Sequence, residues 1–376
     1  MPRHGCPKRM LNGPCGGGSR GVCEVDGRRC VWVEAYVKAL EKHRIHIFEY
    51  PLLDAGFQMV EHEPRPREPR STLMKMILGD MKPLIYEVEL GPEGSLDEVA
   101  ETIKRVNEAG FDAVTMTDNP LGATGIDPLA PAAVARFLLG VEMAVHVTCR
   151  DRSRAALVSW LLAVAGLGIG NVIVSTGDWP LLYRNNRWSI HPVFDLDSVR
   201  LTYLARLVTD LHVDHTGRRL LGEPFFHVGV VANPYFDPLD IEILKLVKKQ
   251  RAGAEFAVTQ PIYTTGAFLK LVKAASERGV EIPFIASLAP LKSYRHAVYL
   301  AERMGVEIPE DYREGLKRNE VDGNIWSYNV EYMKKLTEEL ASLEEVRGIL
   351  FITHGIHGGV IDLAIDYARE ASRILK

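Results

Sequence analysis

Four of the five cysteines in this 376-residue chain lie within its first thirty residues. They are Cys6, Cys15, Cys23 and Cys30, and no two of them have the C-x2-C spacing of common zinc ribbons and bacterial ferredoxins. Glycines and prolines between them allow the backbone to fold tightly around a small centre. The pattern predicts four thiolates that hold an iron–sulfur cluster or a zinc ion, with a disulfide pair or unligated thiols as alternatives.

Polar or ionisable residues end nearly every short β-rich run further along the chain. These residues are Glu89, Thr115 with Asp118, His146, Asp178, Asn233, Gln260 and Thr353. Any one of them could serve only to cap the following helix. Because the carboxyl ends of the strands in a parallel barrel meet at one face, the set as a whole predicts a site there.

Several of these side chains suit acid–base and heterocycle chemistry. Glu87 and Glu89 are two residues apart on one run, so their side chains point the same way. A carboxyl group in a mostly apolar pocket has a raised pKa and can act as a general acid near neutral pH. Asp178 could stabilise a developing cation or tune a cofactor, and Gln260 offers a donor and an acceptor to the edge of a heterocycle.

Eight β-rich runs, each followed by an amphipathic helical pattern, must position these residues. The runs cover 84–90, 113–116, 142–149, 171–176, 225–232, 256–260, 284–289 and 348–353. This alternation predicts an α/β protein with a (β/α)8 TIM barrel. A doubly wound open sheet is the alternative, but it would show a phosphate-binding glycine fingerprint after its first strand, and "ELGPEG" is not one.

Composition divides the chain into three parts. Residues 1–60 are expected to form a small cysteine-rich metal-binding module with one helix at 30–44. Residues 61–82 contain a charged, proline-rich linker and a short helix, and 83–376 form the barrel.

Composition also limits the location and the partners. The amino-terminal "MPRHGCPKR" lacks the apolar core of a signal peptide, and the most apolar stretch, at 156–175, is interrupted by glycines. We therefore expect a cytoplasmic protein without a membrane segment, in a reducing compartment that favours metal ligation over disulfides. The formal net charge of -4 provides no general attraction to nucleic acid or to membranes.

Several stretches of the barrel resemble the methylenetetrahydrofolate reductase family. They occur in the family's order: "ELGP", "HVTCRDRSRAALVSWLLAVAGLGIGNVIVSTGD", "VFDLDSVRL", "VGVVANP" and "AGAEFAVTQPIY". The resemblance covers about 83–370. The cysteine-rich segment is similar to a small module that occurs beside or fused to such reductases in anaerobic microbes, where it is associated with iron–sulfur centres. Two loops differ from the family's pattern, "ELGPEG" with its Gly91 and "THGIHGG" at 353–359.

The resemblance implies a flavin-bearing barrel that reduces 5,10-methylenetetrahydrofolate, or a related C1-tetrahydropterin, to the 5-methyl form. Matched by motif, Glu89 is the general acid and Asp178 stabilises the iminium cation. Gln260 binds the pterin, and Tyr294 stacks on the ligand. The implied flavin-binding residues are Thr115, His146, Thr176, Gly177, Asp178, Phe194, Asn233 and, at the phosphates, Lys249. The implied cofactor is FAD, with FMN as the alternative.

The resemblance also implies redox partners. A [4Fe-4S] cluster on the four cysteines would pass electrons from ferredoxin or a partner subunit, and NAD(P)H is the other candidate donor. Zinc in the same place would make the module structural or a docking surface, and an oligomer or hetero-complex is expected. The competing class is a non-redox barrel that binds a tetrahydropterin for methyl transfer and docks a partner through the cysteine-rich segment.

Overall fold

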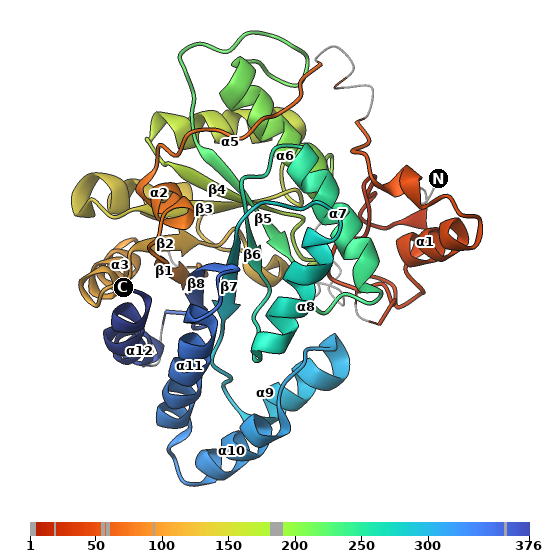
Figure 1. The fold of residues 1–376 in the computed structure, drawn as a ribbon. Helices are drawn as coiled ribbons and strands as arrows, with labels where there is room; N and C mark the ends of the chain where they lie inside the picture. Colours follow the sequence, from red (N-terminus) through yellow and green to blue (C-terminus); the bar gives the residue numbers. More distant parts are fainter. Residues whose placement is uncertain are drawn as a thin grey trace.

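Eight parallel strands form a closed barrel in the computed structural model, which describes residues 5–18, 20–53, 57, 61–92, 95–180, 191–356 and 359–376. Each strand pairs with the next, and β8 pairs back to β1 (Figure 1). The strands are β1 (Leu84–Val88), β2 (Ala113–Met116), β3 (Met143–Thr148), β4 (Asn171–Ser175), β5 (His227–Ala232), β6 (Phe256–Thr259), β7 (Phe284–Leu288) and β8 (Val346–Ile352). The predicted TIM barrel is confirmed, and the pairing of β1 with β8 excludes the open sheet.

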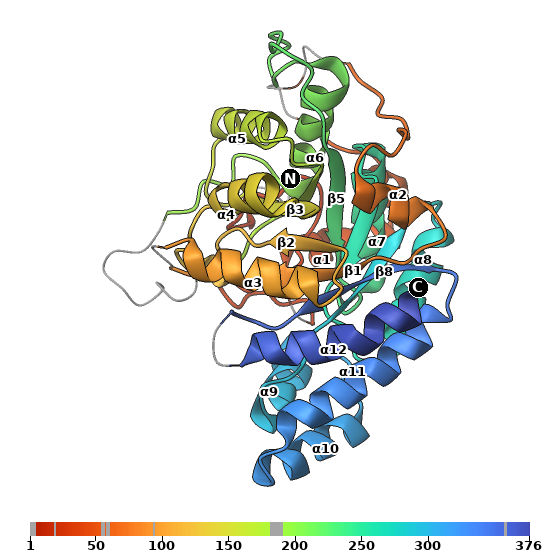
Figure 2. The same ribbon diagram turned by 90° about the vertical axis from the view of Figure 1, so that its left-hand side faces the viewer.

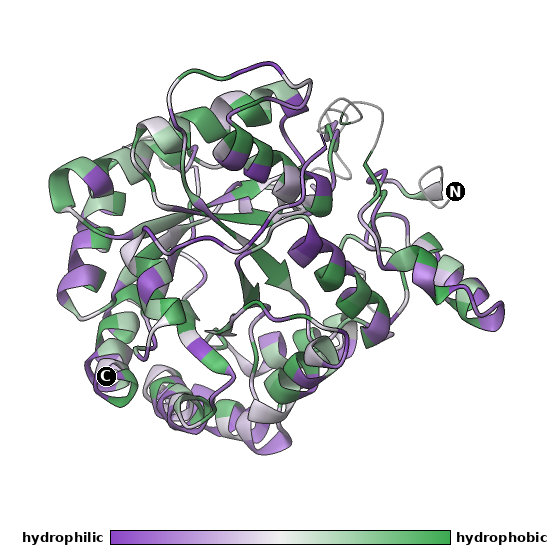
Figure 3. Ribbon diagram, turned by 45° about the horizontal axis from the view of Figure 1, so that its top comes forward, coloured by the Kyte–Doolittle hydropathy of each residue, from purple (hydrophilic) through white to green (hydrophobic). Residues whose placement is uncertain are grey.

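Helices surround the barrel and pack their apolar faces on the outside of the strands (Figure 3). They are α3 (Asp97–Glu108), α4 (Leu129–Val134), α5 (Arg154–Gly166), α6 (Ser198–Arg206), α7 (Leu239–Arg251), α8 (Thr265–Ser276), α9 (Tyr294–Tyr299), α10 (Glu310–Val321), α11 (Ile325–Ala341) and α12 (Val360–Leu375). Short 3-10 or π segments are η4 (Pro120–Gly122), η5 (Ala135–Leu139), η7 (Leu207–Leu211) and η8 (Leu300–Met304). None of the helices in the described ranges combines the length and apolar character needed to cross a lipid bilayer.

Two of these helices, α4 and α10, were not predicted from the sequence. α4 has six residues and contains Pro131, so it carries little helical periodicity. α10 buries Tyr312, Gly315 and Leu316, which form a narrow apolar stripe. Together α9, α10 and α11 make an extension on one side of the barrel (Figure 2).

The amino-terminal end of the barrel is closed by α2 (Thr72–Leu78), the short helix that the sequence predicted within residues 61–82. Its apolar residues Leu73, Met74 and Ile77 are buried in one cluster with interior residues of the strands. Ser71, which caps α2, donates to Asn171 at the start of β4. The candidate site must therefore lie at the other end, where the strands end.

Residues 5–53, which we call the head, lie against the outside of the barrel beside α7 (Figure 1). The head contains α1 (Val31–Glu41) and the 3-10 segment η2 (Ile45–Phe48). The carboxylate of Asp197, which caps α6, accepts hydrogen bonds from the backbone amides of Leu11 and Asn12 at 2.9 and 3.1 Å.

Two lysines of α7 complete this docking surface from the other side. Lys245 and Lys248 are buried, and their ammonium groups donate to the backbone carbonyls of Pro14 and Asn12 at 2.6 and 3.3 Å. The barrel thus supplies charged side chains to backbone groups of the head, and these charge-assisted hydrogen bonds fix the head's position.

Candidate active site

A polar layer lies above an apolar layer inside the barrel. The apolar layer includes Ile85, Ala113, Ala144 and Ile285. Side chains two residues apart on a strand share a face. The next interior positions toward the carboxyl ends of the same strands are therefore Glu87, Thr115, His146 and Ser287.

Three side chains of this polar layer have buried atoms that need a partner. Thr115 Oγ1, His146 Nε2 and Ser287 Oγ make no hydrogen bond to the residues that the structure describes. Buried polar atoms in native proteins nearly always have a partner, so a polar ligand seated on this layer would satisfy them. The sequence analysis named Thr115 and His146 but missed Ser287, although its spacing of two residues from the interior Ile285 could have found it.

The fourth side chain, Glu87, lies beside His146. Glu87 Oε2 and His146 Nε2 are 3.6 Å apart. Burial, with a smaller contribution from Glu89, raises the pKa of Glu87 to about 8. Burial lowers the pKa of His146 to about 4. Near neutral pH the pair is therefore a protonated carboxyl group beside a neutral imidazole.

Glu89, the predicted general acid, follows β1 at the open end. Its side chain is 25% exposed, and Oε2 lies 3.4 Å from Nδ1 of His354, which follows β8. The hydroxyls of Tyr86 and Thr353 are 2.6 Å apart and join the ends of the same two strands. His354 was not predicted as a site residue, and the second histidine of its loop, His357, lies outside the described residues.

The segment after β4 turns sharply to present Asp178. Gly177 has a φ of 87°, and a Cβ there would lie 3.0 Å from the Cβ atoms of Thr148 and Arg150, so glycine is required. The buried Arg150 donates to the Asp178 carbonyl at 3.2 Å. Asp178 itself is exposed, and its Oδ2 accepts the amide of Leu121 at 3.0 Å. The sequence analysis missed Arg150, which positions this segment.

Phe194 lies between an indole ring and a lysine of the head. Its ring stacks on Trp179 with 6.1 Å between centroids, and Lys8 Nζ lies 5.4 Å from its centroid. Lys8 also donates to the carbonyl of Gly177 at 2.8 Å and pairs with Glu24 at 2.6 Å. One head residue therefore reaches the segment that carries Asp178.

The remaining predicted site residues differ in their exposure and in their hydrogen-bond partners. Gln260 is exposed directly after β6, and Thr176 Oγ1 donates to Ser198 at 3.5 Å. Three others are engaged elsewhere in the protein. The Asn233 amide donates to the head carbonyl of Gly16, Lys249 donates to the Val231 carbonyl between α7 and β5, and the Tyr294 ring lies 5.4 Å from Lys317 of α10.

Lys249, which was predicted to bind the flavin phosphates, is buried. Burial lowers the pKa of Lys249 to about 7, so the ammonium is held less firmly as a cation than an exposed lysine. Its bond to Val231 directs it toward the strand.

The four cysteines of the head open onto one cavity of about 170 Å³, which Lys8, Trp32 and Phe236 also line. All four are free thiols, so the structure contains no disulfide pair among them. Burial raises the pKa of Cys6 and Cys30, and raises that of Cys15 to about 12. In the described part of the chain, no group of three or more His, Cys, Asp or Glu side chains is arranged to hold a metal ion.

Two family models match stretches of the chain. Residues 91–356 match the family model described as methylenetetrahydrofolate reductase. Residues 1–52, which contain the four cysteines, match a second model described as methylene-tetrahydrofolate reductase C terminal. In this chain the segment of that second type precedes the barrel.

Individual relatives are distant and longer. Methylenetetrahydrofolate reductase (NADH) 1 of Arabidopsis thaliana is 24% identical over 269 residues, which are 68% of this chain and 43% of the plant protein. A probable methylenetetrahydrofolate reductase (NADPH) of Caenorhabditis elegans is 23% identical over 253 residues, 63% of this chain and 35% of the worm protein. The chain thus spans less than half the length of either relative.

Among solved structures, an uncharacterized protein from Clostridium thermocellum has the same fold. It superposes with a TM-score of 0.56 at 16% identity, and the match covers 81% of this chain and 100% of the clostridial chain. At this identity the likeness extends to the fold alone.

Proposed function

Because the chain belongs to the methylenetetrahydrofolate reductase family, we propose that it is a flavin-dependent oxidoreductase that reduces 5,10-methylenetetrahydrofolate, or a related C1-tetrahydropterin, to the 5-methyl form. The observation that carries the proposal is the set of carboxyl and amide side chains at the open end of the barrel, of which the family model matches residues 91–356. Glu89, Asp178 and Gln260 follow β1, β4 and β6, and all three reach the solvent there.

Each of these side chains has a defined task in the proposed reaction. Glu89 donates a proton to the bridging amine nitrogen of the substrate, so that the carbon–nitrogen bond breaks and an electrophilic iminium remains. The exposed carboxylate of Asp178 stabilises that cation by its charge. The Gln260 amide hydrogen-bonds the edge of the pterin ring through one donor and one acceptor.

Residues at the same end fit a flavin, FAD or alternatively FMN. The unpartnered atoms of Thr115 and His146 suit the polar edge of an isoalloxazine ring. Gly177 follows β4, the strand that pairs with the His146 strand β3, and the Trp179–Phe194 stack begins two residues later. The flavin would supply the hydride that completes the methyl group. Asn233 and Lys249 would hold it only after giving up their present partners.

We also propose that Cys6, Cys15, Cys23 and Cys30 hold a [4Fe-4S] cluster, with zinc as the alternative. Four thiolates around a single zinc ion converge to about 2.3 Å from it. The four thiols open onto one cavity, and four cysteine thiolates are also the usual ligands of a [4Fe-4S] cluster. Such a cluster supplies one-electron chemistry, and the donors would be ferredoxin, a partner subunit or NAD(P)H.

Anaerobic purification followed by an absorption spectrum and assays for flavin, iron, sulfide and zinc tests both proposals. We expect flavin bands and equal amounts of iron and sulfide. Flavin with zinc and without iron would be consistent with the proposed reductase but would overturn the proposed cluster. Failure to bind any flavin, even after reconstitution, would overturn the reductase.

Glu89→Gln tests the assigned acid. We expect methylenetetrahydrofolate reduction with a viologen donor to fall by about 10²–10⁴-fold, because the proton donor is lost. The flavin content and its bleaching by dithionite should stay at the wild-type level. A variant with wild-type turnover would show that Glu89 is not the acid.

A non-redox tetrahydropterin-binding barrel is the second candidate function. The clostridial protein with the same fold binds two copies of 5-methyl-5,6,7,8-tetrahydrofolic acid, and two predicted flavin ligands are engaged within this chain. Binding of 5-methyltetrahydrofolate by a colourless protein that takes up no flavin would favour this candidate.

A further inference from the structure

The loop after β8 places an imidazole beside the proposed acid. His354 Nδ1 is 3.4 Å from Glu89 Oε2, and the two side chains are 33% and 25% exposed. The strands that carry them are neighbours, with Glu87 paired to Ile352 in the parallel register. The contact is therefore set by the closure of the barrel.

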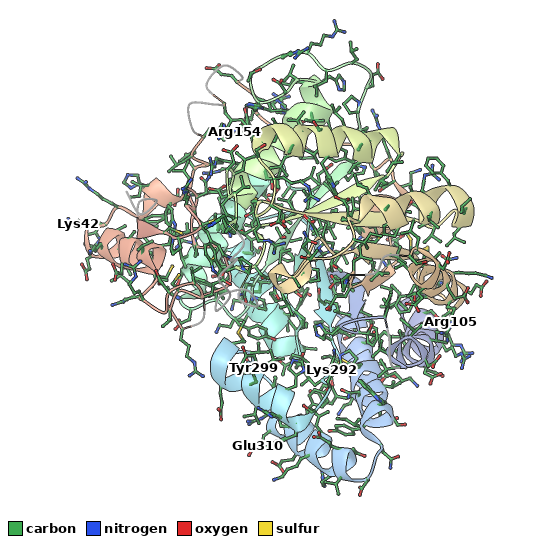
Figure 4. All side chains as sticks on the ribbon, turned by 180° about the vertical axis from the view of Figure 1, so that it is seen from behind. Lys42, Arg105, Arg154, Lys292, Tyr299 and Glu310 are labelled. Carbon is green, nitrogen blue, oxygen red and sulfur yellow. The ribbon has the colours of Figure 1, made fainter. Side chains whose placement is uncertain are left out.

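The backbone of His354 is held in a conformation that histidine seldom adopts. Its φ is 56°, in the left-handed region, which costs a residue with a Cβ about 1–2 kcal/mol. Lys292 Nζ donates to the His354 carbonyl at 2.8 Å, and Thr353 Oγ1 donates to the carbonyl of Gly355 at 3.1 Å. Figure 4 shows Lys292 between the barrel and the helices of the extension. Such strain is retained where the surrounding structure enforces it, and it directs this ring toward Glu89.

Among the described titratable groups around Glu89, His354 is the exposed one in direct contact with its carboxyl group. Glu87 of β1 is 12% exposed and carries its proton near neutral pH because its pKa is about 8. His296 of α9 has its ring 6.1 Å from that of His354, and burial, His354 and Lys292 lower its pKa. Tyr86 is buried and bonded to Thr353. Imidazole groups exchange protons with water between about pH 5 and 8, and His354 is one-third exposed.

We propose that His354 is the positioning and proton-supplying partner of Glu89, an inference that rests on the proposed function of that glutamate. In this relay the pair carries one shared proton, which passes from Nδ1 of His354 to Oε2 of the Glu89 carboxylate and from Glu89 to the substrate nitrogen. The neutral imidazole then takes a proton from water. One proton enters from solvent for each proton delivered to the substrate, and no electrons move in this relay.

The first test is the pH profile of kcat/KM for 5,10-methylenetetrahydrofolate in His354→Asn. Asparagine tolerates the left-handed backbone but cannot store the proton. We expect the basic limb of the profile to move to lower pH by about one unit or more, toward the range of an isolated carboxyl. His212→Asn is the matched control, since His212 also has a left-handed φ of 55° but ends η7.

A loss of activity that is equal at every pH would indicate a structural role and overturn the proposal, as would an unchanged profile. His354→Gly adds a chemical readout, because free imidazole should restore activity through the space left by the side chain. Failure of imidazole to rescue an otherwise folded, flavin-loaded His354→Gly enzyme would also count against the relay.

A titration without turnover separates this inference from the proposed function. The ring signal of His354, assigned by its loss in His354→Asn, should titrate at lower pH in Glu89→Gln, since an adjacent carboxylate favours the imidazolium. If the enzyme is active but the His354 ring titrates at the same pH in the wild type and in Glu89→Gln, the relay is wrong while the proposed reaction stands. A coupled titration in a protein without reductase activity would overturn the proposed reaction and its relay, leaving only a proton-sharing pair.

Discussion

Burial makes the ionised form of the Glu87 carboxyl group unfavourable. Glu87 lies in the polar layer inside the barrel, and its pKa rises from the ordinary value of 4.5 to about 8. The folded state therefore binds this proton more tightly than the unfolded chain. The stability that this provides is fully present below about pH 4.5 and is lost as the pH rises through about 8.

We expect Glu87→Gln to gain stability relative to the wild type as the pH rises from about 5 to about 8.5. Glutamine has a similar shape and does not titrate, so the difference should grow by about 2–4 kcal/mol across this window. Urea unfolding at a series of pH values measures it. Glu338→Gln on the exposed side of α11 is the control, and a pH-independent difference for Glu87→Gln would contradict a raised pKa.

Single residues differ in how far the sequence could identify them. The interior positions Glu87, Thr115 and His146 follow from the two-residue period of a strand. The partners of Asn233 and Lys249 do not, because they depend on a head carbonyl 217 residues away and on the direction of a buried ammonium. The sequence showed only that the loop containing His354 is unusual. It could not show the contact of His354 with Glu89, because that contact depends on the pairing of β8 with β1.

At the scale of elements, the head and α7 are joined by buried lysines that donate to backbone carbonyls and by apolar head residues such as Trp32 and Val33, which are buried in the same cluster as α7. We expect Lys245→Met to loosen this joint, because the variant leaves the buried Pro14 carbonyl without its donor, at a cost of about 1–3 kcal/mol. Hydrogen exchange of α1 should accelerate while exchange in the barrel strands stays unchanged. Lys270→Met on the exposed side of α8 is the matched control. Equal exchange of α1 in both variants would mean that the head is held by other contacts.

The elements themselves were largely predictable where burial is continuous. Runs such as "NVIVS" and "AVTM" are buried along nearly their whole length in parallel strands and keep their sequence boundaries within a residue or two. The helices α4 and α10 were missed because their apolar residues are few and are buried mainly through neighbours distant in sequence.

At the scale of the whole molecule, the side chain of Lys8 links the cysteine cavity to the barrel mouth. Lys8 lines the cavity and bonds to Gly177 in the segment that carries Asp178. A change in the cavity therefore has a direct path to the candidate site through this buried ammonium.

We expect Cys6→Ser with Cys23→Ser to prevent binding of the proposed cluster or zinc ion and to lower Tm, because two of the four proposed ligands are lost. The circular dichroism of the barrel should remain native. Cys149→Ala is the control, since this fifth cysteine is buried after β3 and outside the cavity. If the double variant retains its metal content, Cys6 and Cys23 are not ligands.

The docking of the head also has a consequence for biosynthesis. Asn12 leaves the ribosome early, but Asp197 follows 185 residues later and Lys248 follows 236 residues later. At roughly 5–20 residues per second, translation needs roughly ten to fifty seconds to supply these partners. During that interval the nascent head presents its thiols without the barrel surface that later covers it, so metal loading during translation would take place on an undocked head.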